Sequence, residues 1–134
     1  MSDIDIIKDL LINESGIDVN EKTRKREVIE MRSLFFTLVK TLNPRTSYNT
    51  IGRNVNVNHA TVLHSLYMFD IYTKYNKDLN DLKLRVTMRY HKERSFYSII
   101  TIGAEIERLE QRLIELKEHK ENLEKDKKIF GSVN

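Results

Sequence analysis

A regular apolar repeat in the last third of the chain restricts the possible folds more than any other feature. From position 99 onward, positions alternately three and four residues apart, most of them Ile or Leu, form a repeat of a little over four heptads. No Pro interrupts the repeat, and Gly103 is its one weak point. This spacing predicts a single long helix with one apolar seam, the pattern of a coiled coil. The seam comprises Ile99, Ile102, Ile106, Leu109, Leu113, Leu116, Lys120, Leu123, Lys127 and Phe130.

The seam predicts oligomerisation, most simply a homodimer through the C-terminal helix. Lys at two core positions of the seam lowers stability and limits the size of the oligomer. In a parallel homodimer, Glu105 would face Glu110, and Arg112 would face Lys117, so both flanking pairs would be like-charged. An antiparallel arrangement, a different partner, and a long helix packed on its own domain remain alternatives. The residues expected at the interface are Ile99, Ile102, Ile106, Leu109, Leu113, Leu116 and Leu123.

The rest of the chain is also predicted to be helical, because the whole sequence has only four Gly and one Pro. Apolar residues at helical spacing mark each element, and Gly16, Asn43-Pro44 and Asn76 supply the stops. The expected helices span 4–15, 21–42 with the basic run 21–26 at its start, 47–55, 59–75, and a stretch from about 79. Side chains expected to face the core include Val28, Met31, Leu34, Phe35, Leu38, Val39, Leu42, Ile51, Val55, Val62, Leu63, Leu66 and Phe69.

Composition excludes several classes of protein. Cysteine is absent, so disulfide frameworks and zinc fingers with thiolate ligands are excluded. No stretch approaches the ~20 apolar residues of a membrane span. His91 and His119 have no companion ligands, and no catalytic arrangement of side chains stands out. We expect a soluble, intracellular protein that is not an enzyme and uses no metal, cofactor or nucleotide.

The positive charge is concentrated in the middle of the chain. Residues 22–53 hold eight Lys or Arg and two Glu, a net charge of +6, whereas the whole chain carries +3. Residues 1–21 are acidic, and residues 99–134 are nearly neutral. Concentrated positive charge favours phosphate binding, although ordinary solvated helix faces would carry similar residues.

The segment from Ser47 to His64 contains the most informative motif. A short helix, a polar turn at 56–58 and a second helix opening with small polar residues predict a helix-turn-helix. In such units the first turn of the second helix meets base edges in the major groove. Asn58, His59, Ala60 and Thr61 occupy that turn.

The same segment closely resembles the C-terminal DNA-binding domain (domain IV) of the bacterial replication initiator DnaA. That family carries Ile-Gly and then Asp-His-Thr-Thr-Val-Leu-His, and this chain has Ile51-Gly52 and then Asn58-His59-Ala60-Thr61-Val62-Leu63-His64. The resemblance covers roughly residues 4–88. It implies an all-α fold with a helix-turn-helix domain of the DnaA domain IV or Trp-repressor type over 1–92. A coiled-coil helix over 93–130 and a tail over 131–134 would follow.

The resemblance also implies a set of DNA contacts. Residues 23–26 match the family's basic loop, and Arg32 falls where the family has an arginine that enters the minor groove. Alternatives stay open: a solvated helix start for the basic run, an ion pair of Arg32 with Glu27 or Glu30, and a capping role for Thr61. His64 is expected to be packed, and Lys40 and Arg45 are weaker candidates. The expected DNA-binding residues are Lys22, Arg24, Lys25, Arg26, Arg32, Ser47, Tyr48, Asn49, Asn56, Asn58, His59, Ala60 and Thr61.

Three departures from the family motif fall where bases are read. Val57 replaces a basic residue, Asn58 replaces an Asp, and Ala60 replaces a Thr. An Asp accepts a hydrogen bond from cytosine, whereas an Asn can pair bidentately with adenine. We therefore hypothesise that the preferred site differs from the initiator's own box.

These patterns predict a binder of double-stranded DNA, either a transcription regulator or a replication accessory factor. No Walker-type phosphate loop is present, so no ATPase is expected. A cytoplasmic, nucleoid-associated location would follow, and the small size suggests a phage or mobile-element origin. The alternative is a protein-interaction module that engages a host or replication protein through its coiled coil. RNA binding is a more distant third, since no stacking aromatic platform is evident.

Overall fold

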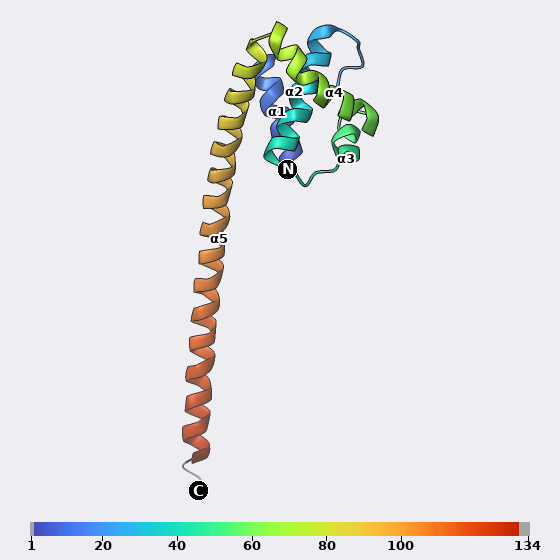
Figure 1. Cartoon of the computed structure of the whole chain (residues 1–134). Coiled ribbons are helices and arrows are strands. Elements are labelled where there is room, and N and C mark those ends of the chain that lie inside the picture. Colours follow the sequence, from blue (N-terminus) through green and yellow to red (C-terminus); the bar gives the residue numbers. More distant parts are fainter. Residues whose placement is uncertain (1, 132–134) are drawn as a thin grey trace. The chain divides into compact units, whose positions relative to one another are not determined.

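The computed structural model describes residues 2–131, and the side chains of residues 2–127. This part of the chain is all helical and contains no strand, which confirms the predicted all-α class (Figure 1). Gly131 belongs to the last helix rather than to the expected tail, and 132–134 lie outside the described residues. No described helix is long and apolar enough to cross a membrane. The helices are α1 Asp3–Ser15, α2 Arg26–Leu42, α3 Tyr48–Arg53, α4 His59–Tyr75 and α5 Asp78–Gly131.

The chain divides into two compact units at the boundary between Glu93 and Arg94. The helix expected near 79 and the helix expected over 93–130 are one continuous helix, α5, which begins in the first unit and continues into the second. No Pro occurs within α5, and Gly103 is its one interior glycine. A single glycine costs a helix only about 1 kcal/mol, which is too little to end it.

In the first unit, the core forms around α2, which packs against both α1 and α4, while α3 packs on α4. The apolar stripe predicted for α2 is buried, apart from the partly buried Leu42 at its end. Phe36 is also fully buried, and its ring lies 5.7 Å from that of Phe35. Phe36 lies outside the predicted apolar stripe. It is buried because α2 is covered on two sides, so that a wider part of its circumference is buried than a single apolar face.

Helix α2 begins later than predicted. The basic run from Glu21 to Lys25 is non-helical, and the helix starts at Arg26. Arg32 accounts for this difference: its guanidinium donates to the carbonyl oxygens of Val19, Glu21 and Thr23. These carbonyls are fixed by a side chain from the helix that follows, so the segment lies against α2 instead of extending it.

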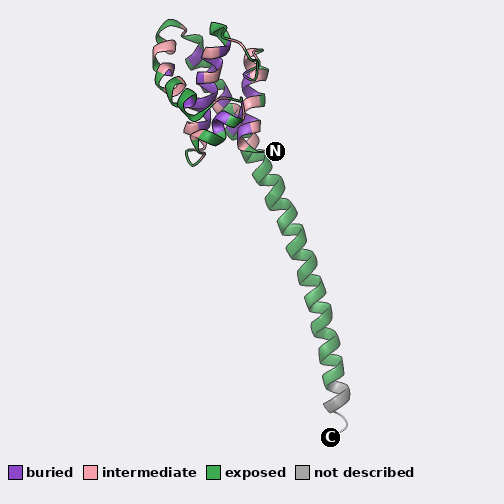
Figure 2. Cartoon of the chain, turned by 90° about the vertical axis from the view of Figure 1, so that its right-hand side faces the viewer, coloured by how far each residue is buried: buried purple, intermediate pink, exposed green. Residues whose placement is uncertain are grey.

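The second unit has a different character. Every described side chain from Arg94 to Lys127 is exposed, whereas buried residues are confined to the first unit (Figure 2). The described part of this unit, residues 94–131, is the continuation of α5. Between Glu105 and Glu124, ion pairs join residues three or four apart on the same helix, as in Arg108 with Glu105 and Lys120 with Glu124. This unit therefore has no core of its own.

Candidate functional site

The turn between α3 and α4 depends on a close approach of two backbone segments. The backbone N–H of Val57 donates to the carbonyl oxygen of Gly52 at 2.9 Å. A Cβ on Gly52 would lie 2.5 Å from the carbonyl oxygen of Val57, so only glycine fits there. Asn56 adopts a left-handed conformation, with φ of 57°, which an Asn tolerates better than most residues. This turn fixes α3 against the start of α4.

Both helices of this unit begin with a side-chain cap. Ser47 Oγ accepts from Thr50 N at 3.2 Å, and Asn58 Oδ1 accepts from Thr61 N at 2.8 Å. The Thr61 hydroxyl also donates to Asn58 Oδ1, at 2.9 Å. Asn58 is therefore the cap, and the capping role considered for Thr61 is wrong. Asn58 Nδ2 has no hydrogen-bond partner within the described part of the chain.

An aromatic stack joins the first turns of α3 and α4. The rings of Tyr48 and His59 are stacked, with centroids 5.7 Å apart and an interplanar angle of 11°. Lys40 Nζ lies 4.5 Å from the centroid of the Tyr48 ring and donates to the carbonyl oxygens of Pro44 and Thr46. Lys40, considered as a phosphate contact, thus holds the loop that leads into α3. The stack brings two of the predicted site residues together.

One face of α4 is exposed along its first half. Ala60, Leu63, His64 and Tyr67 follow the helical spacing i, i+3, i+4 and i+7, and all four are exposed. The prediction that Leu63 faces the core is wrong, since its side chain is 42% exposed. His64, expected to be packed, is exposed as well. The opposite side of α4 packs on the core through the buried Val62 and Phe69 and the partly buried Leu66 and Tyr72.

Apart from the residues around the starts of α3 and α4, the basic run forms a second group of predicted site residues, all of them exposed cations. Lys22, Arg24, Lys25 and Arg26 are all exposed. Arg32 lies behind them, partly buried and bonded to the run's backbone. Neither ion pair considered for Arg32 is present, and a minor-groove contact stays a prediction that requires these backbone bonds to open.

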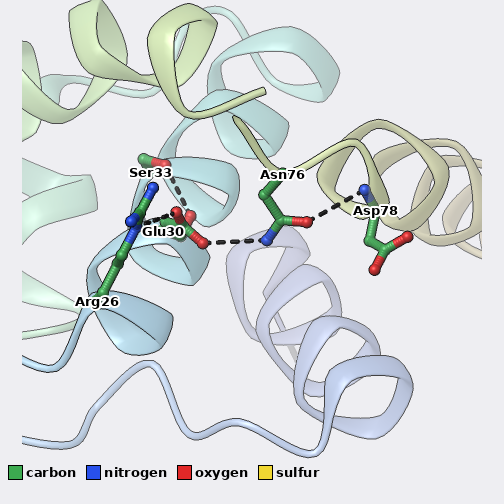
Figure 3. Close-up of polar contacts among 5 residues, drawn as sticks. All are labelled: Arg26, Glu30, Ser33, Asn76 and Asp78. Carbon is green, nitrogen blue, oxygen red and sulfur yellow. Dashed lines mark hydrogen bonds and ion pairs between the residues drawn. The ribbon is translucent and has the colours of Figure 1, made fainter. Parts of the chain in front are cut away.

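A buried carboxylate places Arg26, the last residue of the basic run, at the far end of α4. Glu30, only 5% exposed, accepts from Arg26 Nε at 3.1 Å and from Asn76 Nδ2 at 3.0 Å (Figure 3). Asn76 is the C-terminal cap of α4, and its side-chain oxygen accepts from Asp78 N, so it also starts α5. Arg26 therefore lies beside the C-terminal end of α4, about 25 Å along the helix from its first turn.

Two further cations, Arg85 and Arg89 of α5, have structural roles. Arg89 pairs with Glu14 at 2.9 Å and also donates to Asn13, while Arg85 pairs with Glu14 at 3.4 Å. These contacts tie the start of α5 to the end of α1. Among the described residues, no group of three or more His, Asp or Glu side chains is placed to hold a metal ion.

No protein-family model, curated protein or solved structure matches this chain. The resemblance to the DnaA domain therefore rests on the residues quoted for it.

The predicted site residues thus fall into two groups. The first surrounds the starts of α3 and α4, and the second is the basic run, whose last residue, Arg26, lies beside the end of α4. Arg53, the exposed last residue of α3, is a further cation near the first group that was not singled out. The members of the first group are Ser47, Tyr48, Asn49, Asn56, Asn58, His59, Ala60 and Thr61, and those of the second are Lys22, Arg24, Lys25 and Arg26.

Proposed function

We propose that this chain binds double-stranded DNA in a sequence-specific manner, with α3, the following turn and α4 acting as a helix-turn-helix. The observation that carries the proposal is the exposed first turn of α4, residues 58–61, braced by α3. In helix-turn-helix proteins this turn enters the major groove while the first helix supports it. The resemblance to the DnaA domain supports the same assignment.

The exposed face of α4 carries suitable chemistry for reading bases. Ala60 offers a methyl group for a thymine methyl, and His64 offers ring nitrogens to base edges. Asn58 uses its oxygen to cap α4, so it would read DNA as a donor through Nδ2 rather than pair bidentately with adenine. This changes the expected mode of recognition: Asn58 would favour an acceptor on the base.

The two groups of site residues suit contacts along one duplex. Ser47 and Asn49 lie at the start of α3, beside the first turn of α4, and Arg26 supplies a cation about 25 Å along α4 from that turn. That separation is less than one turn of B-DNA, about 34 Å. Phosphate contacts at both ends of α4 would fix its register in the groove.

The biological role that we propose is transcription regulation or an accessory step in replication, in the cytoplasm at the nucleoid. The domain that the chain resembles belongs to a replication initiator. The chain has no Walker-type phosphate loop, so the proposal is confined to DNA recognition.

Selection of binding sites from random duplexes tests the proposal directly, with Ala60→Glu as the disrupting variant. A carboxylate there would face the duplex, yet it suits the start of a helix, so the fold should persist. We expect binding to the selected site to weaken by roughly 10- to 100-fold, the equivalent of about 1–3 kcal/mol. Asn80→Glu is the matched control, because it makes the same charge change in the exposed first turn of α5.

Equal weakening by Ala60→Glu and Asn80→Glu would contradict a reading role for the start of α4. A second selection, with Asn58→Asp and Ala60→Thr together, tests the altered specificity. An unchanged selected motif would refute the hypothesis that these two residues set the site.

The exposed seam of α5 favours a second candidate, a protein-interaction module whose helical head serves only as a scaffold. Salt dependence separates the two functions. A DNA binder should lose affinity for a random duplex steeply as salt rises, because cation release drives its phosphate contacts. Absence of binding even at low salt would favour the interaction module.

A further inference from the structure

The second unit presents one continuous apolar seam to solvent. Its seven Ile and Leu side chains, the ones predicted at the interface, are 48% to 69% exposed. An isolated helix has nothing to bury such a seam against, and burial of each Leu or Ile is worth about 1.5–3 kcal/mol. The charges along the seam indicate which partner fits.

A parallel pairing of two copies places like charges together at four levels. Core positions would meet their own counterparts, so Lys120 would face Lys120 and Lys127 would face Lys127. Beside the core, Glu105 would face Glu110 of the partner copy, and Arg112 would face its Lys117. All of these contacts are repulsive.

An antiparallel pairing removes the core conflicts. When the two helices are aligned about the midpoint between Ile114 and Glu115, Leu113 faces Leu116 of the partner copy, and Ile106 faces its Leu123. Lys120 then faces Leu109, and Lys127 faces Ile102, so no Lys meets another Lys. A Lys beside an apolar residue can lay its methylene stem on the seam and extend its ammonium into water.

The flanking charges favour the same arrangement. In this register Glu110 faces Lys117 of the partner copy, and the two-fold symmetry repeats the pair. Neither residue has an ion-pair partner on its own helix within the described part of the chain. By contrast, Arg112 is paired with Glu115 on its own helix. Antiparallel pairing would therefore supply ion-pair partners for Glu110 and Lys117.

One flanking pair is unfavourable in this register. Glu105 would face Asp126 of the partner copy near each end of the overlap. Arg108 already pairs with Glu105 on the same helix, which reduces the repulsion. The pair is also exposed, where a charge interaction is worth less than about 1 kcal/mol.

We infer that residues 99–127 pair with a second copy of this chain as an antiparallel coiled-coil dimer. Two first units would then attach at opposite ends, with the two copies of Arg94 about 60 Å apart, from 1.5 Å per residue. A parallel dimer would put both at one end. The inference does not depend on DNA binding. If the heads do bind DNA, the dimer joins two separated sites and raises the apparent affinity by effective concentration.

Disulfide trapping tests the orientation, and the absence of native cysteine makes the background clean. Ile106→Cys and Leu123→Cys are made separately in the full chain, mixed, and equilibrated in a glutathione redox buffer. The antiparallel register predicts that the mixture forms a disulfide dimer and that each variant alone forms little. Dimers formed equally well by each variant alone would overturn the inference, since they report a parallel pair.

A charge-reversal series gives an independent readout of the dimer dissociation constant by sedimentation. Glu110→Lys places Lys opposite Lys117 twice in the antiparallel dimer, and we expect dissociation to rise roughly 10-fold. In a parallel dimer the same change would create an attractive pair with Glu105 and tighten association. The double variant Glu110→Lys with Lys117→Glu should restore the native affinity. A monomeric mass of 15.9 kDa for the native chain at micromolar concentration would overturn the inference altogether.

Discussion

The two units of this chain are both helical but bury their apolar side chains differently. In the first unit, Ile, Leu, Val and Phe from all of its helices meet in one core. In the second unit, the apolar side chains lie along one helix and remain exposed. Helices in water gain most of their stability from packing of an apolar face. The first unit therefore has a core of its own, whereas the apolar side chains of the second unit have no counterpart within it.

The charged side chains differ in the same way. In the first unit, cations reach across the fold: Lys8 donates to the carbonyl oxygen of Asn54 at 2.7 Å, and Arg32 and Lys40 hold loops. In the second unit, the ion pairs between Glu105 and Glu115 join residues only three apart. Some cations of the first unit are therefore hydrogen-bonded to its own backbone carbonyls, and only its exposed cations are free to contact phosphate groups.

The largest expected effect comes from removing a core ring of the first unit. Phe35 is fully buried at the centre of α2, so Phe35→Ala should lower the free energy of unfolding by about 3–5 kcal/mol. Urea unfolding followed by circular dichroism measures this change. Leu113→Ala, a truncation in the second unit, should leave the main transition of the first unit in place and should weaken self-association instead. A comparable loss in both variants would break the distinction between the units.

The fold was largely predictable because periodicity and stop signals agree along most of the chain. Gly16 ends α1 in a left-handed conformation with φ of 72°, and α4 spans the predicted residues 59–75. The start of α2 was not predictable, because it depends on Arg32 reaching back across nine or more residues. Helix α5 is continuous because no strong helix-breaking residue occurs in it. This continuity was not predicted, because the spacing of the apolar residues changes near residue 93.

Around the candidate site, the starts of the helices were more predictable than the arrangement of their side chains. The motif at 58–64 identified the first turn of α4, and the cap by Asn58 is a local feature that the residue type allows. The exposure of Leu63 and His64 depends on which side of α4 packs against α2 and α3. The apolar residues of α4 are not concentrated on one face, so the sequence alone does not indicate that side. The Glu30 contact with Asn76 joins residues 46 apart, so no local pattern indicated it.

A smaller effect is expected at the one glycine inside the second unit. A Cβ at Gly103 would meet nothing within 4 Å, so Gly103→Ala adds no clash. Ala is favoured over Gly in a helix interior by about 1 kcal/mol. We expect more helix signal on heating and slower hydrogen exchange in the second unit, with the first unit unchanged. Loss of helix signal would show that position 103 is constrained by a contact made only in an assembly.

The smallest expected effect lies at the edge of the first unit, where α1 begins. Ser2 Oγ accepts from Asp5 N at 3.3 Å and donates to Asp5 Oδ2 at 2.7 Å. The hydrogen bond from the Ser2 hydroxyl holds the pKa of the Asp5 carboxyl below its ordinary value. A lowered pKa in the folded state contributes stability at neutral pH, and this contribution is lost as the pH falls below about 4.

Ser2→Ala removes both the cap and this pH dependence. We expect a loss of about 0.5 kcal/mol at neutral pH, at the low end for a helix cap because the site is exposed. The difference from the native chain should shrink as the pH falls from about 5 to about 3, since protonated Asp5 no longer accepts strongly from the hydroxyl. Urea unfolding across that range measures it, with Ser98→Ala, an exposed serine of the second unit, as the control. A difference that stays constant with pH would assign the stability to the backbone cap alone, and a loss of several kcal/mol would show that α1 is nucleated from this end rather than held by the core.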